Sequence, residues 1–443
     1  MEAADSRRGP AQLRGLAARQ RARLTTIGMI GGYFLLLLAL GGRSGWSRLG
    51  VAPGSLEFQD LNNVTSAWEC TRRGIRVLPV NPCDPDRRPA DFPHLWLVPS
   101  PLGLGPGDTV LLGWILAVVF LAATVAVIPG RARIGTAIAY GLGVCSPAVM
   151  LGVERGNPDL LLFPLVVAAV LVTSRTRAWQ AVSAGLLLVV AALKFYPLLA
   201  AGFLLRRATR TSLIWLGAVA VASGIYMLAI LGQIHEILAS IPQSNVLAYG
   251  VRRLSYVFSA AAREVFDGRF TSYRAWDIGL DLLGLAGGWL VFRSLRGTVR
   301  VASDDPDAQR DLELFWAGAC LYVGSYMIFV SQDYRLIFAL LTIPQLVRWV
   351  RERRLIAYAT AVAFVATLGL DGSTKLILAG RVVAWWDRLT AVGPDVLPFS
   401  FAAIGQFALL VLFAGWLLAT APTFPWGPRI DSANRGERYR GAR

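Results

Sequence analysis

Lysine, histidine and nucleotide-binding motifs are scarce or absent in this sequence. Lys194 and Lys375 are the only lysines among 44 basic residues, and the two histidines, His94 and His235, have no metal-ligand spacing. No P-loop or Rossmann glycine pattern occurs, so neither nucleotide energy nor a nucleotide-sugar donor is indicated. The sequence therefore predicts no metal site and no cofactor.

Charged residues are also few, at 16% of the chain, whereas 55% of the 443 residues are hydrophobic. Apolar runs recur from end to end, and in lipid such runs satisfy their backbone hydrogen bonds as helices. We predict an all-α polytopic membrane protein, a bundle of about 11–12 transmembrane or half-membrane helices with extracytoplasmic loop helices. The candidate helical segments are 24–42, 109–128, 134–151, 159–173, 181–193, 195–205, 213–231, 278–295, 312–330, 335–350, 356–370 and 397–419.

The net charge of +16 does not indicate nucleic acid as a partner, because the arginines cluster at the ends of apolar runs. The positive-inside rule places such clusters in the cytoplasm. We expect a basic cytoplasmic segment at 1–23, a single membrane domain at 24–420 and a basic cytoplasmic tail at 421–443. The protein would be a multi-pass protein, in a bacterial plasma membrane, with membrane lipids around it.

The same rule predicts a broken helix near Lys194. Basic clusters at 174–177 and 206–210 both lie inside, so residues 178–205 must cross outward and return. Each arm is too short to cross a core of about 30 Å. We predict a hairpin of half-helices broken at "KFYP" (194–197), where proline removes a donor. The alternative is one kinked span with a weak violation of the charge rule.

The first outer loop, 43–108, contains Asp60, which could act as a general base or cap a helix. Cys70 and Cys83 lie in the same loop. An oxidising compartment would permit a disulfide between them, and the alternative is that both stay unbonded. A second long outer segment, 232–277, reads as a lid over the site.

Three further polar groups fall on the predicted outer face. "ERGNPD" precedes a short span of about 15 residues, so its turn could form a recessed pocket wall or be an ordinary helix start with a Glu154–Arg155 pair. Lys194 could meet a phosphate or snorkel. "SQDYR" offers Arg335 as a phosphate ligand or as half of a local pair with Asp333. The remaining pocket candidates are Asn157, Asp159, Tyr196, Gln332 and Tyr334.

These motifs together resemble the polytopic glycosyltransferases of the GT-C class. Within that class the sequence is similar to family 87 and its polyprenol-phosphate-mannose-dependent mannosyltransferases. The matching pieces occur in the family's order over 24–350: "QDLNNVTSAWECTRRG", "ERGNPDLLLF", "ALKFYPLL" and "QDYRLIFALLTIPQL". "ERGNPD" departs from the "GQ-x-N" type of the mannosyltransferase branch, and "SQDYR" stands where some relatives carry histidines, which leaves the sugar and acceptor open.

The resemblance implies a polyprenyl-phosphate sugar donor, a lipid or glycan acceptor outside the cytoplasm and inverting transfer. It assigns the general base to Asp60 and the donor phosphate to Lys194 and Arg335, with Arg155 in reserve. Two other classes of function stay open: a transporter or flippase for lipid-linked glycans, which also uses broken helices, and a non-catalytic scaffold for envelope assembly.

Overall fold

A computed structural model describes residues 8–129, 132–173, 176–207, 209–240, 248–251, 254–255, 273–296, 305–328, 331–369 and 397–422. Three predicted segments lie wholly or mostly outside the described residues. They are the basic tail from residue 423, most of the lid at 232–277, and the segment 371–396, which the charge pattern also predicts to be an outer loop.

Each apolar segment of the sequence falls on a helix or on two consecutive helices. The uninterrupted ones are α1 (Arg8–Ala39), α4 (Thr109–Val127), α7 (Asp159–Thr173), α8 (Arg177–Leu193), α10 (Arg210–Ala229), α13 (Tyr273–Leu295), α14 (Pro306–Ile328), α16 (Leu355–Gly369) and α18 (Leu397–Thr420). Three segments are divided: α5 (Ile134–Val144) with α6 (Pro147–Arg155), the 3₁₀ helix η4 (Tyr196–Ala201) with α9 (Gly202–Arg207), and the 3₁₀ helix η5 (Asp333–Thr342) with α15 (Ile343–Arg351).

Five described helices are long and apolar enough to cross a membrane, or six if α5 and α6, bent by 53°, form one span. The prediction of an all-α polytopic membrane protein is confirmed. The one small sheet pairs β1 (Ala248–Tyr249) antiparallel with β2 (Ser331–Gln332), within the described residues.

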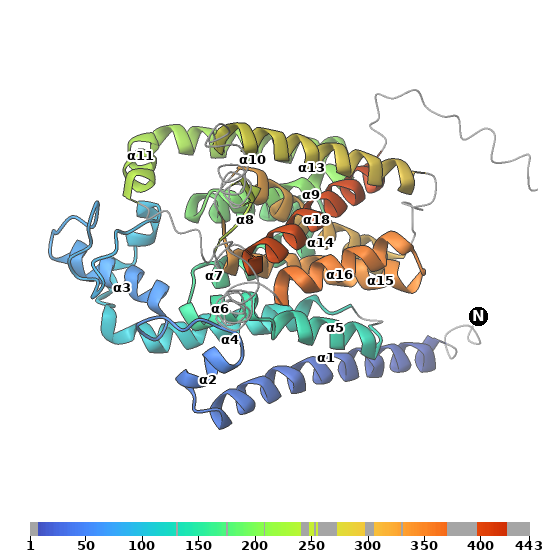
Figure 1. Ribbon diagram of the computed structural model, residues 1–443, viewed down its shortest axis with the longest axis horizontal. Helices are drawn as coiled ribbons and strands as arrows, with labels where there is room; N and C mark the ends of the chain where they lie inside the picture. Colours follow the sequence, from blue (N-terminus) through green and yellow to red (C-terminus); the bar gives the residue numbers. More distant parts are fainter. Residues whose placement is uncertain are drawn as a thin grey trace, which may run out of the picture.

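Residues 43–108, which the charge pattern predicts to be the first outer loop, fold into their own layer at one end of the bundle. It contains α2 (Arg43–Arg48), α3 (Gln59–Arg72) and the 3₁₀ turns η1 (His94–Leu97), η2 (Ser100–Leu102) and η3 (Pro106–Asp108). Figure 1 shows α3 at the left end of the long axis, whereas the N-terminus of α1 and the helix α15 lie toward the right. Helix α11 (Leu231–Ser240) joins this layer, because Gln233 Nε2 donates to the Phe92 carbonyl at 3.4 Å.

Arginines at the ends of the apolar runs also bond to other helices. Arg207 binds both carboxylate oxygens of Glu313, at 2.7 and 3.1 Å, and donates to the carbonyl of Thr173 at 2.9 Å. Arg310 donates in the same way to the carbonyl of Val127 at 2.8 Å. The last carbonyls of a helix lack partners within the helix and carry partial negative charge, so these cations both cap α7 and α4 and join them to α14.

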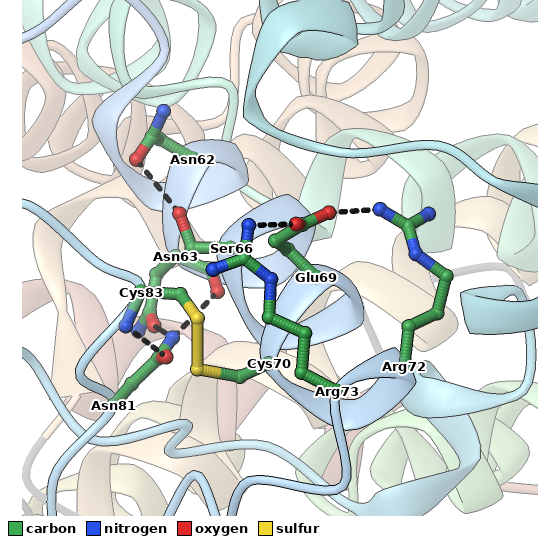
Figure 2. The surroundings of a disulfide bond; sticks show 9 residues. All are labelled: Asn62, Asn63, Ser66, Glu69, Cys70, Arg72, Arg73, Asn81 and Cys83. Carbon is green, nitrogen blue, oxygen red and sulfur yellow. Dashed lines mark hydrogen bonds and ion pairs between the residues drawn. A yellow bond between two sulfur atoms is a disulfide. The ribbon is translucent and has the colours of Figure 1, made fainter.

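Helix α3 is held in its layer by apolar packing and by a covalent bond. Apolar side chains of α3 and of the loop after it form a separate buried cluster: Phe58, Leu61, Val64, Ala67, Trp68, Cys70, Val77, Ala90, Phe92 and Trp96. Cys70 and Cys83 form a disulfide, with their Cα atoms 5.8 Å apart. Beside it Asn81 Nδ2 donates to the backbone and side-chain oxygens of Asn63 (Figure 2).

Replacing Cys70 and Cys83 by serine should loosen this layer. The disulfide closes a loop with a sequence separation of 13, for which loop-closure entropy is worth about 3 kcal/mol. We expect faster amide hydrogen exchange across residues 59–97 in the purified, detergent-solubilised double variant. Cys145→Ser, which removes a thiol that forms no disulfide, should leave that exchange unchanged. Equal exchange in the wild type and the double variant would show that apolar packing alone fixes the layer.

Candidate active site

The first outer loop packs against the turn between α6 and α7. Helix α6 ends at Arg155, and Gly156 follows in the left-handed conformation with φ 60°. A Cβ atom at Gly156 would lie 2.8 Å from Phe58 Cβ, so only glycine permits this approach. The Phe58 amide donates to the carbonyl of Glu154 at 3.2 Å, and the Gly54 amide donates to the Glu154 carboxylate at 2.9 Å.

Asn157 in this turn links the first-loop carboxylate to the start of α7. Its Nδ2 donates to Asp60 Oδ2 at 2.7 Å, and its Oδ1 accepts from the Asp159 amide at 3.0 Å. Asp60 is in the first turn of α3 and caps nothing, because the N-cap position is Phe58. The side chain of Asp60 is 23% exposed, so this carboxylate is accessible to a substrate.

Lys194 completes the network from the other side. Its Nζ donates to Asp159 Oδ1 at 2.7 Å; the Lys194 side chain is 20% exposed, whereas that of Asp159 is fully buried. Asp60, Asn157, Asp159 and Lys194 therefore form one continuous set of contacts, although they come from three separate parts of the chain.

The predicted break in the chain at "KFYP" is present. Helix α8 ends at Leu193, Lys194 is extended with φ −158° and ψ 132°, and η4 begins at Tyr196. The freed carbonyl of Leu193 accepts from Trp96 Nε1 at 2.9 Å, which ties the break to the first loop. Helix α8 begins at Arg177, not at residue 181, so the first arm is longer than the apolar run alone suggested.

Two cations gather around Tyr196. The Lys194 Nζ atom lies 5.8 Å from the centroid of the Tyr196 ring and 5.6 Å from that of Tyr334. The guanidinium carbon of Arg335 lies 4.5 Å from the Tyr196 ring centroid. Cations within about 6 Å of a ring face are attracted to it. Tyr196 and Arg335 also border a narrow gap, too tight to hold a water molecule, which is lined in addition by Tyr249, Leu321, Tyr322, Ser325, Phe338 and Ala339.

The remaining predicted residues lie next to this network or are buried beside it. Arg155 pairs with Glu154 at 3.4 Å and donates to Gln59 Oε1 at 2.6 Å, so it faces the start of α3. Asp333 is buried, and Gln332 belongs to the short β-pair with Ala248. The site lies at the α3 end of the bundle (Figure 1), which the charge pattern predicts to be outside.

Sequence reasoning missed Arg88, which contacts Asp60 from the side away from Asn157. Arg88 Nη1 is 3.6 Å from Asp60 Oδ1, and Arg88 Nη2 bonds to Asp84 Oδ2 at 2.8 Å and to the Gln59 carbonyl at 2.5 Å. The stretch "DPDRRP" reads as a solvated charge run. The signal that could have found Arg88 is Cys83, since a disulfide to Cys70 brings the stretch alongside α3.

The sequence model of glycosyltransferase family 87 matches residues 93–321, just over half of the chain. The chain belongs to glycosyltransferase family 87. It is thus a membrane glycosyltransferase, which uses a sugar donor and an acceptor. No curated protein and no solved structure matches it. The matched part of this glycosyltransferase includes Asn157, Asp159 and Lys194, whereas Asp60 and Arg335 lie on either side of the match.

Gly156→Ala should weaken the packing of the first loop against the turn between α6 and α7. An alanine in the left-handed backbone conformation costs about 1–2 kcal/mol, and its Cβ atom would overlap with Phe58. We expect a lower midpoint of thermal unfolding for the detergent-solubilised protein. Gly152→Ala, within α6 just before this turn, is the matched control, because the nearest contact of its Cβ, Tyr334 Cβ at 3.5 Å, is an ordinary one. Equal midpoints for the two variants would contradict the proposed fit.

Lys194→Met should destabilise the protein through Asp159. Removing one partner of a buried ion pair typically costs about 3–5 kcal/mol, because the other charge is left uncompensated. Asp159→Asn combined with Lys194→Met removes both charges and should recover most of the lost stability, as measured by thermal unfolding. If the double variant is no more stable than Lys194→Met, the ion pair with Asp159 is not the reason why Lys194 stabilises the protein.

Proposed function

We propose that this family 87 enzyme transfers a sugar from a polyprenyl-phosphate donor to a lipid or glycan acceptor outside the cytoplasm, with inversion. Asp60 is the general base, and Lys194 and Arg335 bind the donor phosphate. The observation that supports this proposal best is the contact network from Asp60 through Asn157 and Asp159 to Lys194. It holds an accessible carboxylate and an accessible cation in one site.

The cation side suits the leaving phosphate. As the bond to the anomeric carbon breaks, negative charge grows on the phosphate oxygen, and preorganised positive groups stabilise that charge. Lys194 and Arg335 share the Tyr196 ring as a neighbour, so a phosphate beside this ring could meet both. The Asp159 carboxylate keeps the ammonium group of Lys194 in place until the donor arrives.

The carboxylate side suits the acceptor. Asp60 Oδ2 is held by Asn157, while Arg88 stands 3.6 Å from Oδ1. A base so held takes the proton of an acceptor hydroxyl as this oxygen attacks the anomeric carbon. Attack from the side opposite the phosphate inverts the configuration, and it needs one base rather than a second nucleophilic carboxylate.

The membrane setting suits a lipid-linked donor. The sequence has no nucleotide-binding pattern, and the charge pattern predicts the site on the side without cytosolic nucleotides. A polyprenyl-phosphate sugar fits both observations, because it carries its own phosphate leaving group and reaches the site through the bilayer without a nucleotide. Membership of a glycosyltransferase family favours sugar transfer over the transport and scaffold alternatives.

Asp60→Asn should abolish most of the transfer while the protein stays folded. Loss of general-base help typically lowers the rate by about 10²–10⁴-fold. The measurement is sugar transfer by purified protein in proteoliposomes supplied with a panel of polyprenyl-phosphate sugars and of lipid and glycan acceptors. Glu57→Gln, which removes an exposed carboxylate from the same loop, should retain activity.

Full activity of Asp60→Asn would remove Asp60 from the mechanism. The Asp159→Asn, Lys194→Met double variant separates function from folding on the cation side: it should be stable yet slow, since no ammonium group is left to meet the phosphate. Transfer at the wild-type rate in that double variant would exclude Lys194 as a phosphate ligand.

A further inference from the structure

Residues 89–96, here called the strap, connect the surroundings of Asp60 to those of Lys194. At one end, Asn63 Nδ2, one turn after Asp60 on α3, donates to the Pro89 carbonyl at 2.9 Å. At the other end, Trp96 Nε1 donates to the carbonyl of Leu193, the residue before Lys194, at 2.9 Å. The strap therefore runs from the base to the cation of the proposed mechanism.

Asp91, in the first half of the strap, is exposed between two buried neighbours. Ala90 and Phe92 are 2% and 7% exposed. The Ala90 amide donates to the Val77 carbonyl at 3.1 Å, and the Phe92 carbonyl accepts from Gln233 Nε2 at 3.4 Å. The backbone on both sides of Asp91 is thus fixed.

The electrostatic surroundings of Asp91 belong to the site. Surrounding protein raises the pKa of the Asp91 carboxyl, the Asp60 carboxylate adds to this rise, and Lys194 and Arg88 oppose it. The side chain of Asp91 nevertheless stays exposed. Within the described part of the chain, no other side chain pairs with it or donates a hydrogen bond to it.

An accessible carboxylate with unused acceptor capacity suits hydroxyl groups and repels anions. The charges of Asp60 and Lys194 both act on the pKa of the Asp91 carboxyl. The strap runs from the neighbourhood of Asp60 to that of Lys194, and in an inverting transfer the sugar ring lies between the base and the phosphate. A carboxylate in that position faces the ring of the donor sugar. It does not face the phosphate, which the cations around Tyr196 attract.

We propose that Asp91 binds hydroxyl groups of the transferred sugar and selects an uncharged sugar over a uronic acid. This inference rests on the proposed function, since it assigns the sugar subsite of the same donor. It names a specificity residue that acts on the ring and leaves the phosphate contact to Lys194 and Arg335.

The test compares binding of a polyprenyl-phosphate hexose with that of the sugar-free polyprenyl phosphate of equal chain length, by tryptophan fluorescence of the purified protein. The wild type should bind the hexose-bearing lipid more tightly. Asp91→Asn should lose this margin by about tenfold, the effect of a lost charged hydrogen bond, and its affinity for the sugar-free lipid should not change. Glu57→Gln should behave as the wild type.

Transfer kinetics give a second measurement. In Asp91→Asn the KM for the donor should rise by about tenfold with a smaller change in kcat, and the preference for hexose over uronic acid should shrink. An unchanged binding margin and preference in Asp91→Asn would overturn the role of Asp91 and leave the transferase function standing. If the wild type binds the hexose-bearing lipid but transfers no sugar, the proposed transferase function is overturned. The difference in affinity between the hexose-bearing and the sugar-free lipid would still test the role of Asp91.

Discussion

The ion pair between Lys194 and Asp159 joins two interruptions of the helical bundle. Lys194 occupies the break after α8, and Asp159 begins α7 with its carboxylate fully buried. A buried carboxylate is costly unless a cation and hydrogen bonds compensate it. Because the compensation comes from another helix, the break and the turn must meet. The Asp159 amide, in the same turn, bonds to Asn157, and Asn157 in turn holds Asp60.

The first outer loop is therefore a structural part of the site and not a cover over it. Its disulfide and its buried cluster give α3 a fixed shape. The contact at Gly156 fixes where α3 rests, and the bond from Trp96 to Leu193 fixes the loop to the break. Asp60, Lys194 and the strap are thus held by short contacts between segments that are far apart in the sequence. Such preorganisation lets charged groups act without costly rearrangement during the reaction.

Charged groups are paired at both ends of the bundle. At the end predicted to be cytoplasmic, arginines such as Arg207 and Arg310 are engaged by carboxylates and helix carbonyls. At the opposite end, Lys194 is paired with Asp159 and its side chain is 20% exposed. Asp60 and Asp91 also keep accessible surface there. What distinguishes the α3 end is therefore the accessible carboxylates that lie near a paired cation.

The sequence by itself determined the helices, the break and the residue types of the site. Helix α7 has the predicted bounds, 159–173, because an apolar run with a proline and an aspartate at its start leaves little choice of conformation. Only the tertiary structure decided which polar groups meet. Asp60 and Asn157 are 97 residues apart, and a hydrogen bond across that distance depends on how the first loop docks. Arg88 and Asp91 were not predicted for the same reason. The local sequence pattern indicates which residues are buried or helical. It does not indicate which distant segments will lie beside a charged residue in a loop.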